Sequence, residues 1–463
     1  MRPTLVLDVV GLTPSLLGEN TPNLATLARR GGMRPLTTVT PAVTCTVQST
    51  LLTGTLPRDH GIVANGWYFR ELSEIWLWRQ SNRLVAGEKV WEAARRLDPT
   101  FTCATLFWWY NMYASSDFAV TPRPQYPADG RKLPDVWSQP PALRDELQEK
   151  LGTFPLFKFW GPGADVTSTR WIADAAVHVL RTRRPTLTLV YLPHLDYDLQ
   201  RLGPNDRALA PQLRAVDAVA GALIDEAERH GIATIVLSEY GITDVGGVVH
   251  PNRVLREAGL LAVRAEAAGE QLDAGASEAF AVADHQVAHV YVRRRERLAE
   301  VADLLRRQPG VDAVWGEEEK RAHGLDHPRS GELVAISRPD HWFTYYYWLD
   351  DDRAPDFART VEIHRKPGYD PVELFVDPAI TLPQLRIAWT LAKRTLGFRS
   401  LLDVIPLDAS LVKGSHGRVT DDPTAGPLVI SDDPDLLPPT PAVPATAVKD
   451  LILAHLGLRP AGS

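Results

Sequence analysis

Cysteine is nearly absent from the chain, which has two in 463 residues, Cys45 and Cys103. Two thiols are too few for a disulfide framework or for a zinc cluster held by thiolates. A bound metal ion would have to be held by histidines, carboxylates or hydroxyls.

Long apolar runs and basic blocks are also missing. No stretch is long and apolar enough to span a bilayer, and the N-terminal apolar run contains an acid, Asp8, and no signal-cleavage pattern. The 50 Lys and Arg residues are outnumbered by 57 Asp and Glu residues, and no basic stripe is present for duplex nucleic acid. We expect a cytoplasmic protein without a membrane or duplex nucleic acid partner.

What is present is the composition of a folded globular protein, with 44% hydrophobic and 23% charged residues. Short apolar runs alternate with helical patterns, which predicts the α/β fold class, with a mostly parallel central sheet flanked by helices. The predicted strands are 4–10, 102–107, 186–192, 233–237 and 426–430. The predicted helices between them include 22–30, 90–97, 169–181 and 208–230.

The pattern changes from about residue 257 to residue 380, where strands, a charged helix and an aromatic run follow one another. This is typical of an inserted, smaller α+β subdomain. We therefore divide the chain into a core (1–256), an insertion (257–380) and a return to the core (381–463). The returning part begins with a helix at 382–396 and ends with an amphipathic helix at 445–456.

Polar residues gather where predicted core strands end. Asp8 lies at the carboxyl end of the first strand, where ligands collect in open parallel sheets. Thr44 opens a segment rich in hydroxyls at the expected start of a helix, a place that favours an anion. Asn65 follows in a loop whose His60 we interpret as a structural hydrogen-bonding residue. Taken alone, Asp8 is explained better as a helix cap or turn residue.

Together these residues carry a resemblance. The string from Thr44 through Leu51-Leu52-Thr53-Gly54 to Asn65 resembles the alkaline phosphatase superfamily, in its nucleotide pyrophosphatase/phosphodiesterase and phosphonoacetate hydrolase branches. The resemblance implies an alkaline phosphatase-like sandwich and two divalent metal ions, usually zinc. It also implies that Thr44 is the nucleophile, Asp8 a ligand of the same metal, and Asn65 a donor to a phosphoryl oxygen.

Later segments resemble the same family in the expected order. Asp196 and His416 match the family's metal-binding Asp and its late Ser-His-Gly in type. Gln200 stands where the family has His, and Glu239-Tyr240 stands where it has Asp-His. The resemblance implies that all five of these residues are metal ligands. Because the departures replace imidazole by oxygen-bearing groups, manganese or magnesium becomes an alternative to zinc.

Other residues offer alternatives for the same site. His364 rivals His416 as a ligand, and the adjacent Arg365 and Lys366 could offer positive charge to a phosphate. His194 and Asp198 flank Asp196 by two residues each and would share its face in an extended segment.

Two histidines and two aromatic segments have a possible packing role. We expect His285 and His289 to be core or surface histidines, because they lie in or beside a predicted strand. Of the aromatic segments, we expect 107–108 to have some contact with substrate and the tyrosine run 345–347 to be structural.

These observations support three hypotheses. The first is a metal-dependent phosphoric ester hydrolase, resembling a phosphodiesterase or nucleotide pyrophosphatase, that acts on a small phosphorylated substrate through a phospho-Thr44 intermediate. The second is a phosphonate hydrolase that cleaves carbon–phosphorus bonds. The third is a degenerate family member that binds a phosphorylated metabolite without catalysis.

Overall fold

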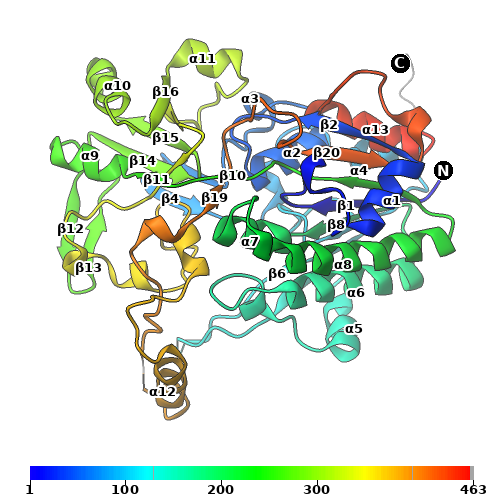
Figure 1. Ribbon diagram of the computed structural model, residues 1–463, viewed down its shortest axis with the longest axis horizontal. Coiled ribbons are helices and arrows are strands. Elements are labelled where there is room, and N and C mark those ends of the chain that lie inside the picture. The colour runs from blue at the N-terminus through cyan, green and yellow to red at the C-terminus, as the bar shows by residue number, and fades with distance from the viewer. Residues whose placement is uncertain (129, 399, 459–463) are drawn as a thin grey trace.

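The main body of the protein is built on one nine-stranded sheet. The computed structural model describes residues 1–128, 130–398 and 400–458 (Figure 1). The strand order is β21-β2-β20-β9-β1-β8-β5-β6-β7, and the central neighbours from β9 to β6 are all parallel. The strands are β1 (Thr4–Val9), β2 (Gly32–Thr37), β5 (Cys103–Leu106), β6 (Phe118–Pro122), β7 (Val136–Gln139), β8 (Leu187–Leu192), β9 (Ala233–Leu237), β20 (Leu428–Ser431) and β21 (Val443–Pro444).

Strand β1 lies at the centre of this sheet. It is buried along its whole length and pairs with β8 on one side and β9 on the other. A strand covered on both faces needs a nearly continuous apolar sequence, so the single acid in it stands out. Asp8 lies in register with Tyr191 and Leu237, which brings the segments that follow β8 and β9 to the same sheet edge.

Helices cover both faces of the sheet (Figure 1). Their apolar sides form two separate clusters with the sheet, one on each face. The first face carries α1 (Pro22–Arg30), α5 (Ala142–Leu151), α6 (Val166–Arg183), α7 (His194–Leu202) and α8 (Ala210–Arg229). The second carries α2 (Thr44–Thr53), α4 (Val90–Leu97) and α13 (Val448–His455), with the short α3 (Pro57–His60) after α2.

A smaller antiparallel sheet, in the order β14-β15-β17-β16, lies to one side of the main body (Figure 1). Its strands are β14 (Ala279–Asp284), β15 (Val287–Val292), β16 (Val311–Trp315) and β17 (Leu333–Ser337), and its helices are α9 (Pro251–Glu257), α10 (Leu298–Arg306) and α11 (Glu317–Ala322). The tyrosines 345–347 are buried in its core, in agreement with their expected structural role.

Four two-stranded pieces complete the strand pairing. They are β3 (Gly66–Phe69) with β4 (Glu74–Leu77), β10 (Thr243–Asp244) with β19 (Gly414–Ser415), β11 (Gly247–Val249) with β18 (His341–Phe343), and β12 (Val263–Glu266) with β13 (Gly269–Leu272). The β10 and β19 pair matters for the site, because it places His416 beside the segment that follows β9.

The α/β fold class and the predicted elements are confirmed, with bounds that differ by a few residues. The helix expected at 382–396 differs in its place. It is α12 (Pro383–Thr395), which projects away from the main sheet (Figure 1). Ile387 packs against the core of the smaller sheet rather than against the main one. The alternating pattern identified a helix but could not show which core it would join.

Candidate functional site

Thr44 is the first residue of α2 and lies at the floor of a large cavity. The preceding Val43 is extended, so the chain turns into the helix at Thr44 itself. The Thr44 side chain is 3% exposed, and its Oγ1 lies 3.1 Å from the hydroxyl oxygen of Tyr240. A hydroxyl at a helix N-terminus is surrounded by backbone N–H groups with no helical partner, a setting that favours an anion.

Asp8 and Glu239 lie together beneath Thr44 and are joined by Gln48. The Gln48 Nε2 donates to Asp8 Oδ2 at 3.1 Å and to Glu239 Oε1 at 2.7 Å. Its Oε1 accepts from the backbone N–H of Trp109 at 2.8 Å. Because that N–H can only donate, the amide nitrogen must face the two carboxyl groups. The remaining oxygens, Asp8 Oδ1 and Glu239 Oε2, are buried and have no hydrogen-bond partner.

Burial makes the charged forms of these two carboxyl groups costly. It raises the pKa of Asp8 to about 7, although hydrogen bonds from Glu239 and Gln48 oppose the shift. Burial, followed by the nearby Asp8, raises the pKa of Glu239 well above its ordinary value. Two buried acids with free oxygens need a proton or a cation between them.

Asp196, on α7, is the third carboxyl group of the site and lines the cavity. Its Oδ1 accepts from the Tyr240 hydroxyl at 3.3 Å, and its Oδ2 accepts from Gln200 Nε2 at 2.7 Å. The Gln200 Oε1 in turn accepts from the hydroxyl of Tyr369 at 3.0 Å. Burial and then the Glu239 charge raise the pKa of Asp196 to about 7.

Three aromatic rings and His416 form a stack beside this carboxyl group. Tyr240 lies on His416 with centroids 3.6 Å apart, His416 on His285 at 3.6 Å, and His285 on Tyr369 at 3.7 Å. His416 gives its Nδ1 hydrogen to the carbonyl of Ala42 at 2.8 Å, which leaves Nε2 as a lone pair 3.7 Å from Asp196 Oδ1. Burial raises the pKa of Tyr240 well above its usual value, so the phenol stays protonated.

His285 is buried, as expected of a core histidine, but it also belongs to the site. Its ring lines the cavity, its Nε2 is buried without a partner, and its backbone φ is 61°, a region that non-glycine residues seldom adopt. The sequence held only a weak signal, because the strand β14, which ends in Asp284 directly before His285, was not predicted. His289, by contrast, is a core residue bonded to the carbonyl of Val63.

Asn65 lies on the cavity wall and is held from two sides. Its Nδ2 donates to Asp284 Oδ1 at 3.1 Å, and its Oδ1 accepts from the backbone N–H of Cys45 at 3.0 Å. Asp284 also accepts from the Asn65 backbone N–H at 2.8 Å. The second Nδ2 hydrogen of Asn65 remains for a ligand, whereas the N–H that follows Thr44 is already used.

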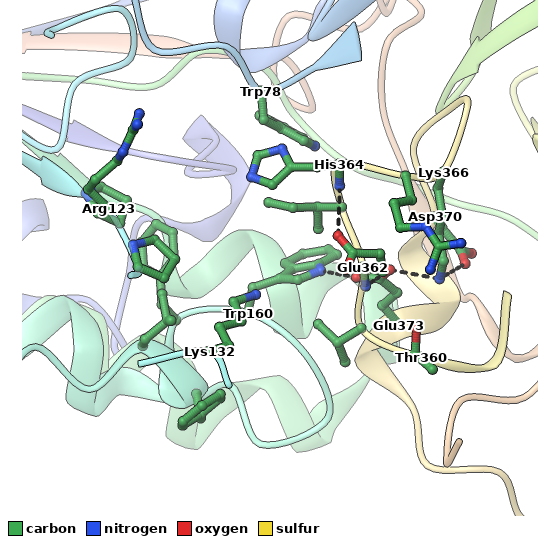
Figure 2. Close-up of a pocket in the computed structure, with 18 of the residues that line it drawn as sticks. Trp78, Arg123, Lys132, Trp160, Thr360, Glu362, His364, Lys366, Asp370 and Glu373 are labelled. Atoms are coloured by element: carbon green, nitrogen blue, oxygen red, sulfur yellow. Dashed lines mark hydrogen bonds and ion pairs between the residues drawn. The ribbon is translucent and has the colours of Figure 1, made fainter. Parts of the chain in front are cut away.

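The cavity has a volume of about 1440 Å³ and runs from this floor toward α12. Figure 2 shows part of its wall, where Trp78 lies beside His364 and Trp160 lies between Lys132 and Glu373. Cationic and indole side chains line this part, namely Arg79, Arg123, Lys132, Trp78, Trp109 and Trp160. Such a wall suits a ligand with a ring and a further negative charge.

Of the two rival histidines, His416 is the one beside Asp196. His364 lines the same cavity, but the charges that act most on its ring are the cations Lys132 and Arg79. Burial, followed by these two cations, lowers the pKa of His364 to about 4. The structure therefore groups His364 with the basic wall and not with the acidic floor.

Two of the expected phosphate-binding residues are used elsewhere. Lys366 is buried between Asp370 and Glu373, at 2.7 Å from each, and Arg365 pairs at the surface with Asp356. The buried lysine instead anchors the loop that carries Tyr369. Ion pairing of this kind cannot be read from sequence spacing.

The α7 residues also differ from expectation. His194, Asp196 and Asp198 lie on a helix and not on an extended segment, so they do not share one face. His194 pairs with Asp198 at 3.3 Å, away from the carboxyl group of Asp196.

The aromatic segment after β5 contacts the cavity through a different residue than predicted. Phe107 packs in the core of the main sheet, and Trp109 lines the cavity.

A sequence model of the type I phosphodiesterase/nucleotide pyrophosphatase family matches residues 4–370. The chain belongs to this family. It is a family of hydrolases that act on phosphoester bonds, and the expectation of that enzyme class is confirmed. A comparison of the sequence with curated proteins found no match.

Solved structures share the fold of this phosphodiesterase family member. Murine ectonucleotide pyrophosphatase/phosphodiesterase 5, in an inactive form with AMP, is 15% identical with a TM-score of 0.60, over 99% of this chain and 96% of its own. Phosphonoacetate hydrolase from Sinorhizobium meliloti, with phosphonoformate, is 15% identical with a TM-score of 0.60, over 98% and 95%. At this identity the likeness shows the fold.

The resemblance implies two metal sites, and the residues of this chain suit one of them better than the other. Within residues 1–128, 130–398 and 400–458, no group of three His, Cys, Asp or Glu side chains is placed to hold a metal ion. Asp8, Glu239 and Thr44 do offer oxygens, two of them buried and unpartnered, and such a set fits one hard cation. Around Asp196 the amide nitrogen of Gln200 and a protonated phenol take the places of ligands, so a second site does not fit.

Proposed function

We propose that this protein is a phosphoric ester hydrolase that depends on one divalent cation and uses Thr44 as its nucleophile. The observation that carries the proposal is the position of the Thr44 hydroxyl, at the buried start of α2, open to the cavity and beside Glu239, whose pair with Asp8 has two unpartnered oxygens. Catalysis needs a hydroxyl that can act as a nucleophile in that place, whereas binding alone needs only a hydrogen-bond donor.

Asp8 and Glu239, with the oxygen of Thr44, would hold the cation. Magnesium or manganese suits three oxygen ligands better than zinc does. When bound, the cation supplies charge that lowers the pKa of a hydroxyl and stabilises negative oxygen. Gln48 holds the two carboxyl groups at a fixed spacing from the opposite side.

Side chains of the site orient the nucleophile and the phosphoryl group. The Tyr240 hydroxyl donates to Asp196 and accepts from Thr44, which fixes the rotamer of the nucleophile. The proton of the Thr44 hydroxyl passes to water as Oγ1 bonds to phosphorus, and the leaving oxygen departs with its part of the substrate and takes up a proton. A water molecule then displaces Oγ1 from phosphorus, which releases the phosphoryl product and restores the Thr44 hydroxyl. The free Nδ2 hydrogen of Asn65 meets charge on a non-bridging oxygen. The basic and indole-lined wall binds the remainder of the substrate.

A second candidate is a protein that binds a phosphoester without cleaving it. It is supported by two glutamine amides that already donate hydrogen bonds to the carboxyl groups of the site. Gln48 donates to Glu239, and Gln200 donates to Asp196. In that case Thr44 and Asn65 would bind a phosphoryl group as donors only.

The test is hydrolysis of a bis-aryl phosphodiester, an aryl phosphomonoester and phosphonoacetate with magnesium, manganese or zinc. Thr44→Ala should lower turnover by about 1000-fold, while Thr44→Ser keeps a measurable fraction. Equal turnover in wild type and Thr44→Ala would exclude Thr44 as the nucleophile. AMP binding by calorimetry without turnover of any substrate would favour the binding protein, and cleavage of phosphonoacetate alone would favour the phosphonate hydrolase.

A further inference from the structure

Large apolar side chains are concentrated on the outside of one segment, residues 382–401. Thirteen large hydrophobic residues of the described chain are well exposed, and seven of them lie in this segment. They are Leu382, Leu385, Trp389, Leu391, Leu396, Phe398 and Leu401. Scattered exposed leucines are ordinary, but a contiguous exposed group of this kind marks a surface that binds something.

Four exposed apolar residues in and beside α12 form a stripe. Leu385 and Trp389 lie four residues apart on one side of the helix, and Leu382 and Leu396 continue the same spacing directly before and after it. Leu385 and Trp389 are each 63% exposed, and Leu396 is 74% exposed. On another side of the helix, Ile387 packs against the core of the smaller sheet and lines the cavity. The helix is thus anchored by one side and presents the other to solvent.

The segment also carries positive charge only. Between residues 381 and 402 the sequence has four Lys and Arg residues and no Asp or Glu, in a chain whose formal net charge is −7. Two of the cations border the apolar stripe: Lys393 lies 5.3 Å from the ring centroid of Trp389, and Arg386 is exposed and pairs with Asp403. Apolar and aromatic residues bordered by cations are the pattern of helices that lie in the interface of an anionic bilayer.

The structure places this stripe next to the substrate cavity. Ile387, Leu391 and Leu401 belong to the same cavity wall as Thr44, at its apolar end. Figure 1 shows α12 projecting beyond both sheets. A flat surface could therefore reach the stripe before it touched the main body.

We propose that residues 382–401 bind the surface of an anionic lipid bilayer. The helix lies in the headgroup region with the stripe Leu382, Leu385, Trp389 and Leu396 toward the acyl chains, and its cations face the anionic headgroups. This binding departs from the sequence-based expectation of no membrane partner. It does not depend on the proposed hydrolase activity, because the stripe lies outside the catalytic floor.

No helix in the described part of the chain could cross a bilayer. The interaction that we propose is attachment to one leaflet, which a single amphipathic helix can provide.

The experiment is flotation of the full chain with vesicles of phosphatidylcholine alone and with added phosphatidylserine. We expect binding to the anionic vesicles and about a hundredfold loss of affinity in Leu385→Ser/Trp389→Ser, because each of the two buried apolar side chains contributes about one factor of ten. Arg386→Glu/Lys393→Glu should remove the preference for anionic vesicles. Leu72→Ser is the matched control, since Leu72 is 53% exposed on a turn far along the chain, between β3 and β4.

Sedimentation velocity and circular dichroism on the same proteins complete the test. Folded, monomeric wild-type protein that fails to float with anionic vesicles would overturn the proposal. Self-association that is lost in Leu385→Ser/Trp389→Ser, without vesicle binding, would also overturn it and would assign the stripe to a second copy of the chain. An equal loss of binding in Leu72→Ser would show that the effect is not specific to α12.

Discussion

Tyr240 and His416 stack face to face, with ring centroids 3.6 Å apart and planes within 7° of each other. The two residues come from segments that the β10 and β19 pairing holds together. In this arrangement the phenol hydroxyl lies between Thr44 and Asp196, in a place where the resemblance would put a histidine.

Tyr240→Phe should lower turnover while leaving the ring stack intact. The variant removes only the hydroxyl that orients Thr44, and a lost hydrogen bond of this kind corresponds to about a tenfold effect on rate. We expect kcat to fall and KM to change little, measured with the preferred ester. An unchanged kcat would show that Thr44 needs no support from Tyr240.

Tyr240→His should increase the affinity for zinc. The substitution places an imidazole, a better zinc ligand than a protonated phenol, beside Asp8 and Glu239. Calorimetric titration with zinc should show binding tightened by at least about tenfold, on the scale of changes around metal ligands. Tyr240→Phe serves as the control and should show no such gain. Identical zinc binding in both variants would place Tyr240 out of reach of the metal.

Gln48→Ala should destabilise the metal-free protein. Two buried carboxyl groups lose their shared donor, at a cost of about 1–3 kcal/mol of unfolding free energy. Manganese should restore part of this loss, because a cation compensates the same oxygens. Gln148→Ala is the control, since Gln148 also donates to a carboxylate, Asp135, away from Asp8. Equal effects of manganese on both variants would argue against a cation site at Asp8 and Glu239.

Stability should fall in mild acid because of His60. Burial, followed by the charges of His327 and Arg329, lowers the pKa of His60 to about 3. The unfolded chain, whose histidines titrate near pH 6.5, therefore binds a proton that the folded chain does not. The contribution of His60 is complete above pH 6.5 and is lost as the pH falls toward 3.

The measurement is urea unfolding at several pH values between 4.5 and 8, for wild type and His60→Gln. Within the affected range, the wild type should lose about 1.4 kcal/mol per pH unit more than the variant. Acids with raised pKa values, such as Asp8, change stability in the opposite direction, but they contribute equally to both proteins and cancel. Parallel curves for the two proteins would mean that His60 is protonated in the fold.

Lys366→Met should destabilise the protein far more than Arg365→Met. The first variant leaves Asp370 and Glu373 buried without their shared cation, which costs about 3–5 kcal/mol. The second breaks a surface pair with Asp356, which is worth at most about 1 kcal/mol. Unfolding by urea at neutral pH measures both, and similar losses in the two variants would contradict the buried pairing.

The sequence alone determined the α/β fold class, the main strands and helices, and the arrival of Asp8 and Thr44 at one end of the site. These features follow from local patterns, because apolar periodicity reports which side of an element is buried and polar residues at strand ends gather at one sheet edge.

Only the tertiary structure placed His416, and not His364, beside Asp196, directed the amides of Gln48 and Gln200 toward carboxyl groups, and added His285 to the site. It also turned the apolar stripe of α12 outward. Such features depend on side chains that are remote in sequence and are brought within hydrogen-bonding or packing distance by the chain crossings, which no local pattern records.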